Sequence, residues 1–321
     1  MRRNILHRSL LTGLSSSGES ININNYLTIE ALVDGLTASL SANYCEYCVD
    51  GDGNWKSLTA GTATEAINTG QTLSFRGNIT PASGVGIGQF TVNKNFNVLG
   101  NVMSMLYGDD AVGKLNLSTF THPFMDLFRS CSTLLSVSEN FLPATTLSAQ
   151  CYRAMFRGCS KLKNAPKLPA TTMKSSCYYQ MFYGCTVLTA APELPATTLA
   201  SQCYLYMFYG CKAFKSCPAL SATTLANNCY QYMFQNCTGL TTAPELTATT
   251  LANYCYSNMF RGCSNLNYIK MLATNISASN CLSNWVNGVA STGTFVKHPN
   301  MTTLPTGANG IPSGWTVIDN T

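Results

Sequence analysis

The chain has few charged residues and no long apolar run. Charged residues make up 10% of the 321 positions, against about 25% in ordinary soluble domains, and this excludes the charge-rich composition of disordered chains and of acidic or basic tails. The 19 Lys and Arg are scattered, with no basic run longer than Arg2-Arg3, so we expect no nucleic-acid partner. Since no apolar run approaches the ~18 residues of a membrane-spanning helix, we also expect no membrane span.

Residues that commonly carry catalysis are scarce. The three histidines, His7, His122 and His298, lie in three different regions, and no G-x-S-x-G motif accompanies them, so a Ser-His-Asp or Cys-His site is not indicated. The 14 Asp and Glu are thinly spread, and nothing marks a carboxylate pair of the glycosidase kind. We therefore expect no enzyme activity and no cofactor.

Two short motifs could bind metal, but both are incomplete. Cys45-Glu46-Tyr47-Cys48 is a C-x-x-C with no second ligand pair, and zinc needs four ligands. Residues 50–54 begin like an EF-hand loop, but Trp55 stands where glycine is required and Gly61 where the bidentate glutamate is required. The run Asp50-Gly51-Asp52-Gly53 is better explained as a hairpin turn, and we expect no metal site.

Cysteines are abundant and periodic. Of the 15 cysteines, twelve fall in two ladders: Cys151, Cys177, Cys203, Cys229, Cys255 and Cys281, and Cys131, Cys159, Cys185, Cys211, Cys237 and Cys263. Side chains at one phase of a repeat point the same way in every coil, which gives poor disulfide geometry even between strands about 4.8 Å apart. We therefore expect reduced cysteines that pack as small apolar side chains.

The first cysteine ladder reveals a tandem repeat of 26 residues, L-x-A-T-T-L-A-x-x-C-Y-x-x-M-F-x-G-C-x-x-L-x-x-A-P-x-L. A fixed period of this size predicts a solenoid, a class of fold that usually provides binding surfaces. Within one repeat, Cys177 and Met181 are four residues apart, as are Tyr178 and Phe182, which is typical of a helical face. Gly184 would end the helix. We predict coils built of a helix and a short strand.

Three parts are expected along the chain. Residues 1–25 form a polar N-terminal arm, which is either disordered or an anchor that docks on a partner. Residues 26–95 contain alternating apolar and polar positions, which predict six or seven short strands in a small immunoglobulin-like β-sandwich. Residues 96–321 form the solenoid, with a capping coil at each end, and Trp285 takes the place of Met259 in the last coil.

The repeat motif Met-Phe-x-Gly-Cys-x-x-Leu-x-x-Ala-Pro resembles the leucine-rich repeats of the BspA-like surface proteins of gut Bacteroidetes. The preceding segment, Cys45 to Trp55, looks like the companion domain of repeat proteins encoded by Bacteroides phages. The resemblance implies a leucine-rich-repeat solenoid that serves extracellular adhesion or host recognition rather than catalysis. The N-terminal segment begins like a signal peptide, but His7-Arg8 interrupts its apolar stretch, and this favours a virion protein over a bacterial adhesin.

Variation between the repeats indicates where a ligand binds. Core positions barely change, whereas the positions expected on the exposed helical face do: Arg153, Ala154, Arg157, Tyr179, Gln180, Tyr183, Leu205, Tyr206, Tyr209, Gln231, Tyr232, Gln235, Ser257, Asn258 and Arg261. Tyr and Arg are enriched in recognition surfaces. The alternative is that these side chains only cover their neighbours. The residues predicted to bind are Arg153, Arg157, Tyr179, Tyr183, Tyr206, Tyr209, Tyr232, Gln235 and Arg261, which we call the stripe.

From these features we expect a non-enzymatic phage surface protein, either a fibre or a decoration of capsid or tail. Its expected partners are a glycan or protein of the host cell surface and, through the arm, other virion proteins; a homo-oligomer is a further expectation. The alternatives are a bacterial cell-surface or secreted adhesin of BspA type, and a structural spacer without a ligand.

Overall fold

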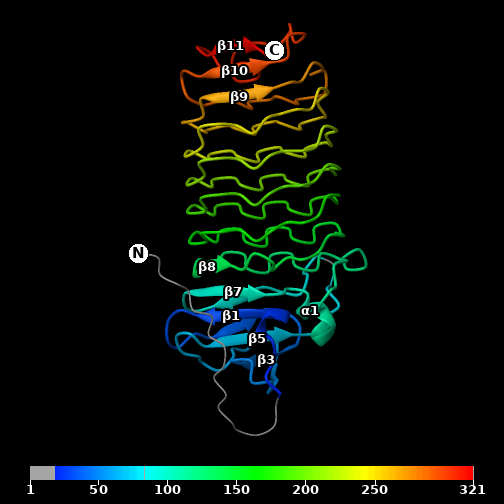
Figure 1. Cartoon of the computed structure of the whole chain (residues 1–321), viewed down its shortest axis with the longest axis vertical. Helices are drawn as coiled ribbons and strands as arrows, with labels where there is room; N and C mark the ends of the chain where they lie inside the picture. The colour runs from blue at the N-terminus through cyan, green and yellow to red at the C-terminus, as the bar shows by residue number, and fades with distance from the viewer. Residues whose placement is uncertain (1–18, 83, 321) are drawn as a thin grey trace.

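The computed structural model of the chain describes residues 19–82 and 84–320. Residues 1–18 of the predicted arm lie outside this range, and with them the apolar side chains expected to dock on a partner, Ile5, Leu6, Leu10, Leu11 and Leu14. A β-rich N-terminal part lies at one end of the molecule, and a tall stack of coils continues from it to the C terminus (Figure 1).

Six short strands fall within residues 26–95, where the alternating pattern predicted six or seven, and a seventh follows in the segment predicted to belong to the solenoid. They are β1 (Leu27–Ala31), β2 (Ala38–Leu40), β3 (Cys45–Val49), β4 (Lys56–Leu58), β5 (Thr72–Arg76), β6 (Phe90–Val92) and β7 (Phe96–Gly100). The hairpin turn predicted at Asp50-Gly51-Asp52-Gly53 is confirmed, because β3 and β4 pair antiparallel on either side of it and Asp50 has a φ of 52°.

The prediction of an immunoglobulin-like β-sandwich is wrong. Such a fold packs two antiparallel sheets of three or more strands each, whereas here one six-stranded sheet has the order β4-β3-β5-β1-β7-β8, and β2 and β6 form only a two-stranded ribbon. The sheet also extends into the repeats, because β7 pairs in parallel with β8 (Leu134–Val137) of the first coil. A single hydrophobic core therefore runs from the strands into the stack.

The predicted leucine-rich-repeat solenoid of helix-plus-strand coils is also wrong. The only α-helix in the described part of the chain is α1 (Ser104–Tyr107), before the repeats, and two short 3-10 helices, η1 (Ile23–Asn25) and η2 (Gly108–Ala111), also precede them. The repeats between β8 and β9 (Tyr268–Met271), all within the described range, contain no strand of the three sheets. Isolated β-bridges and single backbone hydrogen bonds join these coils instead.

Backbone amides in each coil alternate between two kinds of partner. Tyr178 and Phe182 donate to carbonyls of the next coil, at 3.1 and 2.9 Å, whereas Tyr179 and Met181 donate to carbonyls three residues back in their own coil. Each coil segment is thus a run of overlapping turns, bonded to the next coil through every second amide. Pairing of this kind satisfies the polar backbone without a helix.

A positive φ at every fourth residue explains the failed helix prediction. In one coil Ser176, Gln180 and Gly184 have φ of 52, 55 and 73°, which a right-handed helix cannot accept. Burial follows the same period, since Cys177-Tyr178 and Met181-Phe182 are buried and the residues between them are not. Over two turns a period of four cannot be distinguished from the helical 3.6.

Aromatic columns fill the core of the stack. Tyr152, Tyr178, Tyr204, Tyr230 and Tyr256 are buried and stack with ring centroids 5.7–6.2 Å apart. A second column, from Phe128 through Phe156, Phe182, Phe208 and Phe234 to Phe260, has spacings of 5.6–6.0 Å. Stacked aromatic pairs contribute about 0.5–1.5 kcal/mol each beyond their buried area, so every coil is stabilised by its neighbours.

The second cysteine ladder has a specific contact. The Cys211 thiol donates to the Phe182 carbonyl of the preceding coil at 3.2 Å, and the Cys185 amide donates to the same oxygen at 3.1 Å. The same thiol contact recurs at Cys159, Cys185, Cys237 and Cys263. All 15 cysteines are free thiols in the structure, and these four, with Cys211, link one coil to the next.

The C-terminal end of the stack is closed by a parallel sheet. The strands β9, β10 (Thr294–Lys297) and β11 (Thr316–Asp319) are arranged in the order β11-β10-β9. Trp285 is fully buried in the position of Met259, as the sequence predicts, and its indole N–H donates to the Gly310 carbonyl at 2.9 Å.

A glycine substitution tests the four-residue period. Gly210 has a φ of 70°, and an added Cβ would meet no atom within 4 Å. We expect Gly210→Ala to lower the free energy of unfolding by about 1 kcal/mol through backbone strain alone. Gly210→Asn should cost less, because Asn tolerates a positive φ and Asn236 occupies the equivalent position at 60°. Equal stability of the Ala, Asn and wild-type chains in urea would contradict this backbone.

Buried thiols predict a loss of stability at alkaline pH. Burial raises the pKa of Cys131, Cys151, Cys203 and Cys255 to about 12, from about 8.5 in an unfolded chain. Because folding favours the neutral thiol, this stabilisation is complete below pH ~8.5 and decreases as the pH rises toward 12. The urea midpoint under reducing conditions should fall steeply between pH 8 and 10.5, and the fall should be smaller in Cys203→Ala. An unchanged midpoint would contradict the buried ladders.

Candidate functional site

The four-residue period turns the stripe outward. After the buried pair Cys177-Tyr178 the next two residues, Tyr179 and Gln180, are only half-buried, and Tyr183 follows Phe182 in the same way. Hydrogen bonds between coils then bring equivalent positions together, since the Gly184 amide donates to the Tyr209 carbonyl at 2.8 Å. Side chains 26 residues apart therefore lie side by side.

Six of the nine stripe residues line one open hollow of about 370 Å³. With Gln180 they are Tyr179, Tyr183, Tyr206, Tyr209, Tyr232 and Gln235. We call this the tyrosine hollow. All seven side chains are half-buried, and each ends in a hydroxyl or amide group. The hollow is therefore neutral and rich in hydrogen-bond donors and acceptors.

The tyrosine rings are held by mutual stacking. Tyr183 and Tyr209 lie face to face with centroids 4.5 Å apart and planes at 4°, and Tyr206 and Tyr232 do so at 4.3 Å and 4°. The two pairs touch through Tyr206 and Tyr209, whose centroids are 5.9 Å apart at 60°. Tyr179 meets Tyr206 edge to face at 6.2 Å. A surface of interlocked rings loses little side-chain entropy on binding.

Two arginines lie at one end of the hollow. The Arg157 guanidinium is 4.9 Å from the Tyr183 ring and donates to the Gln180 side-chain oxygen at 2.8 Å. Arg153 is 5.3 Å from the Tyr179 ring. Arg153 is exposed and Arg157 is half-buried. Cation–π contacts fix both charges next to the tyrosines.

One carboxylate lies near these arginines. Burial raises the pKa of Asp126, although Arg129, Arg153 and Arg157 lower it. Its Oδ1 is 3.6 Å from Arg129, which belongs to the coil preceding that of Arg153. Asp126 thus offsets only part of the positive charge at this end.

Four predictions of exposure, at positions outside the stripe, fail because they assumed a helix. Ala154, Leu205, Ser257 and Asn258, counted among the exposed variable positions, are buried. Arg261 is exposed, as expected, but lies outside the residues that line the hollow. Asn236, which the sequence did not single out, donates to the Tyr209 hydroxyl at 3.0 Å. Its signal in the sequence is the replacement of a recurrent glycine.

Positive φ recurs at every fourth residue of the coils, and two tyrosines of the hollow occupy such positions. Tyr206 and Tyr232 both have a φ of 57°, a conformation that bulky residues rarely adopt. Equivalent positions hold Ala154, Gln180 and Asn258. Strain of this kind costs about 1–3 kcal/mol per residue, and Tyr254, which does not line the hollow, shares it with a φ of 55°.

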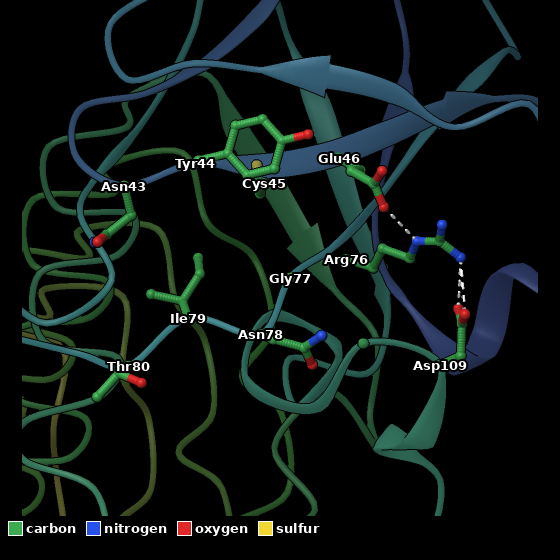
Figure 2. A pocket seen from close by; sticks show the side chains of 11 residues that line it. Asn43, Tyr44, Cys45, Glu46, Arg76, Gly77, Asn78, Ile79, Thr80 and Asp109 are labelled. Carbon is green, nitrogen blue, oxygen red and sulfur yellow. Dashed lines mark hydrogen bonds and ion pairs between the residues drawn. The ribbon is translucent and has the colours of Figure 1, made fainter.

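A second hollow, of about 510 Å³, lies in the N-terminal part beside β3 and β5 (Figure 2). Arg76 spans it between two carboxylates, donating to Glu46 at 2.8 Å and to both oxygens of Asp109 at 2.8 and 2.9 Å. Its guanidinium also lies 4.1 Å from the Trp55 ring, and the Tyr26 hydroxyl donates to Asp109. These partners satisfy the charge, and the cluster ties β3 and β5 to η2.

The motifs with metal-binding character have other partners. Asp50 accepts from Gln71 at 2.7 Å and from the Thr72 amide at 2.8 Å, and Asp52 accepts from Asn54 at 2.9 Å. Within residues 19–82 and 84–320, no three His, Cys, Asp or Glu side chains are grouped as a metal site requires. The same residues contain no helix of the length and apolarity needed to cross a bilayer.

Comparison with known proteins gives no relative from which a function could be transferred. No family model matches the chain, and neither a curated protein nor a solved structure does. The functional argument therefore depends on the tyrosine hollow and its surroundings.

A double-mutant cycle tests the stacking in the hollow. Tyr183→Ala and Tyr209→Ala should show a coupling of about 0.5–1.5 kcal/mol in the free energy of unfolding, as stacked pairs do. Tyr209 and the exposed Tyr44 of the N-terminal part, which share no partner, provide the control and should show a coupling near zero. Equal coupling in the two cycles would contradict the arrangement.

Proposed function

We propose that the chain is a non-catalytic recognition protein of a phage particle, and that the tyrosine hollow with Arg153 and Arg157 binds a glycan or protein of the host cell surface. The observation that carries the proposal is the gathering of six stripe residues in one hollow. These residues vary between repeats whose core positions are nearly constant. Packing alone requires no such concentration of tyrosine.

The chemistry of the hollow supports recognition. Tyr and Arg supply large contact area together with polar groups, and they dominate the energetics of binding surfaces. Strain at Tyr206 and Tyr232 is retained although Asn or Gly would relieve it.

The location on a virion is supported by resemblance. The segment from Cys45 to Trp55 looks like the companion domain of phage-encoded repeat proteins. In this proposal the N-terminal arm attaches the chain to other virion proteins, and the stack projects outward, with homo-oligomerisation as a further element of the proposal. The repeat motif favours a second candidate, a bacterial cell-surface adhesin of BspA type.

Substitution of the hollow tests recognition against a spacer role. We expect attachment of the purified chain to host cells to fall about tenfold or more in the triple variant Tyr183→Ser, Tyr209→Ser and Tyr232→Ser. Tyrosine is one of the side chains that carry most of the binding energy at interfaces, and the variant removes three of them. The control replaces two exposed tyrosines elsewhere, Tyr44→Ser and Tyr268→Ser, and should attach normally. Attachment that survives the triple change, in a chain with normal unfolding, would contradict the proposal and favour a spacer.

Immunogold electron microscopy of the source culture tests the location. Antibody against the purified chain should label phage particles, and the label on head or tail would distinguish a decoration from a receptor-binding fibre. Label on cell envelopes with unlabelled particles would contradict the virion location and favour the adhesin.

A further inference from the structure

Mutual stacking leaves ring edges and hydroxyls of the tyrosine hollow available to a ligand and covers part of the ring faces. Stacking covers one face each of Tyr183, Tyr209, Tyr206 and Tyr232, and Arg157 lies against Tyr183 as well. A neutral sugar that binds by stacking needs an open aromatic face. The edge of an aromatic ring carries partial positive charge, so the exposed part of this surface favours electron-rich groups.

Hydrogen-bond donors reinforce this preference. Burial raises the pKa of Tyr206 to about 12 and also raises the pKa of Tyr183. Their hydroxyls therefore remain protonated at neutral pH and can donate. Gln235 and Gln180 add amide N–H groups.

The charge on this side of the stack is positive and largely uncompensated. None of the ion pairs among the described residues includes Arg153, Arg157 or Arg261. The repeats between Leu142 and Leu266 hold only two acids, Glu193 and Glu245. Glu245 pairs with Lys270 at 2.9 Å, and Glu193 lies beside Lys167 in a separate hollow lined by prolines. Asp126, whose pKa Arg153 and Arg157 lower, offsets part of their charge.

We propose that the ligand of the tyrosine hollow is an anionic glycan. Its acidic groups, carboxylate or sulfate, contact Arg153 and Arg157, and its remaining oxygens accept hydrogen bonds from the tyrosine hydroxyls. The inference rests on the proposed function and narrows its ligand class. From Arg157 to Gln235 the surface crosses three coil spacings, about 14 Å at a strand-like separation, which suits a short stretch of a linear chain lying along the stack.

Three soluble polysaccharides test the ligand class on the full chain. Alginate carries carboxylates only, dextran sulfate carries sulfates, and dextran is the neutral parent. We expect at least one anionic polymer to bind at least tenfold more tightly than dextran at low salt, with affinity falling as salt rises. Preference for alginate or for dextran sulfate identifies the acidic group.

A matched pair of variants assigns the binding to this surface. Arg153→Gln with Arg157→Gln should weaken binding of the preferred anionic polymer at least tenfold. Lys161→Gln with Lys163→Gln removes the same charge from exposed positions of the same coil and should have little effect. Equal losses in both variants, or equal affinity for dextran, would overturn the inference.

The two experiments distinguish a wrong ligand class from a wrong proposed function. If no anionic polymer binds while the triple tyrosine variant still loses attachment to host cells, the anionic-glycan inference is wrong and the hollow remains a recognition site. If the triple variant also attaches normally, the proposed function itself is contradicted.

Discussion

The conformation and register of the coils depend on an alternation of backbone hydrogen bonds. Every second amide donates to the next coil and the others close turns within their own coil, as at Tyr178 and Tyr179. The pattern requires a positive φ at every fourth residue, as at positions 150, 154 and 158 of the first full repeat and their equivalents. Gly or Asn, which accept this conformation most readily, recurs at the third of these positions. The pattern also sets the register of the stack, because a shift of a coil by two residues would exchange its buried and outward pairs.

The same register aligns equivalent residues of successive coils both in the core and on the surface. Buried pairs form the tyrosine, phenylalanine and cysteine columns, and each column extends only by contact with the neighbouring coil. Outward pairs form columns too, so a difference of one side chain between repeats becomes a local feature of a continuous surface. The tyrosine hollow arises in this way, where three successive coils carry tyrosine and their neighbours carry arginine or amides.

From periodicity and alternation the sequence predicted the 26-residue period and the short strands within residues 26–95, whereas the binding role of the stripe stays a prediction. The prediction of the conformation within the coil failed, since Cys177 and Met181 are equally compatible with a helix and with four-residue turns. The same error placed Ala154 and Leu205 on the surface, although both are buried. Face-to-face stacking of Tyr206 on Tyr232 and the contact from Asn236 could not be predicted, because they depend on side-chain rotamers across coils.

The most direct test of the central claim is hydrogen–deuterium exchange of the full chain with and without polysaccharide isolated from the host cell surface. The account predicts slower exchange on binding in peptides that cover residues 179–183, 205–209 and 231–235, with no change in the proline-containing segments around residues 166–169 and 192–195. Protection confined to those proline segments or to the N-terminal strands would contradict a ligand site at the tyrosine hollow.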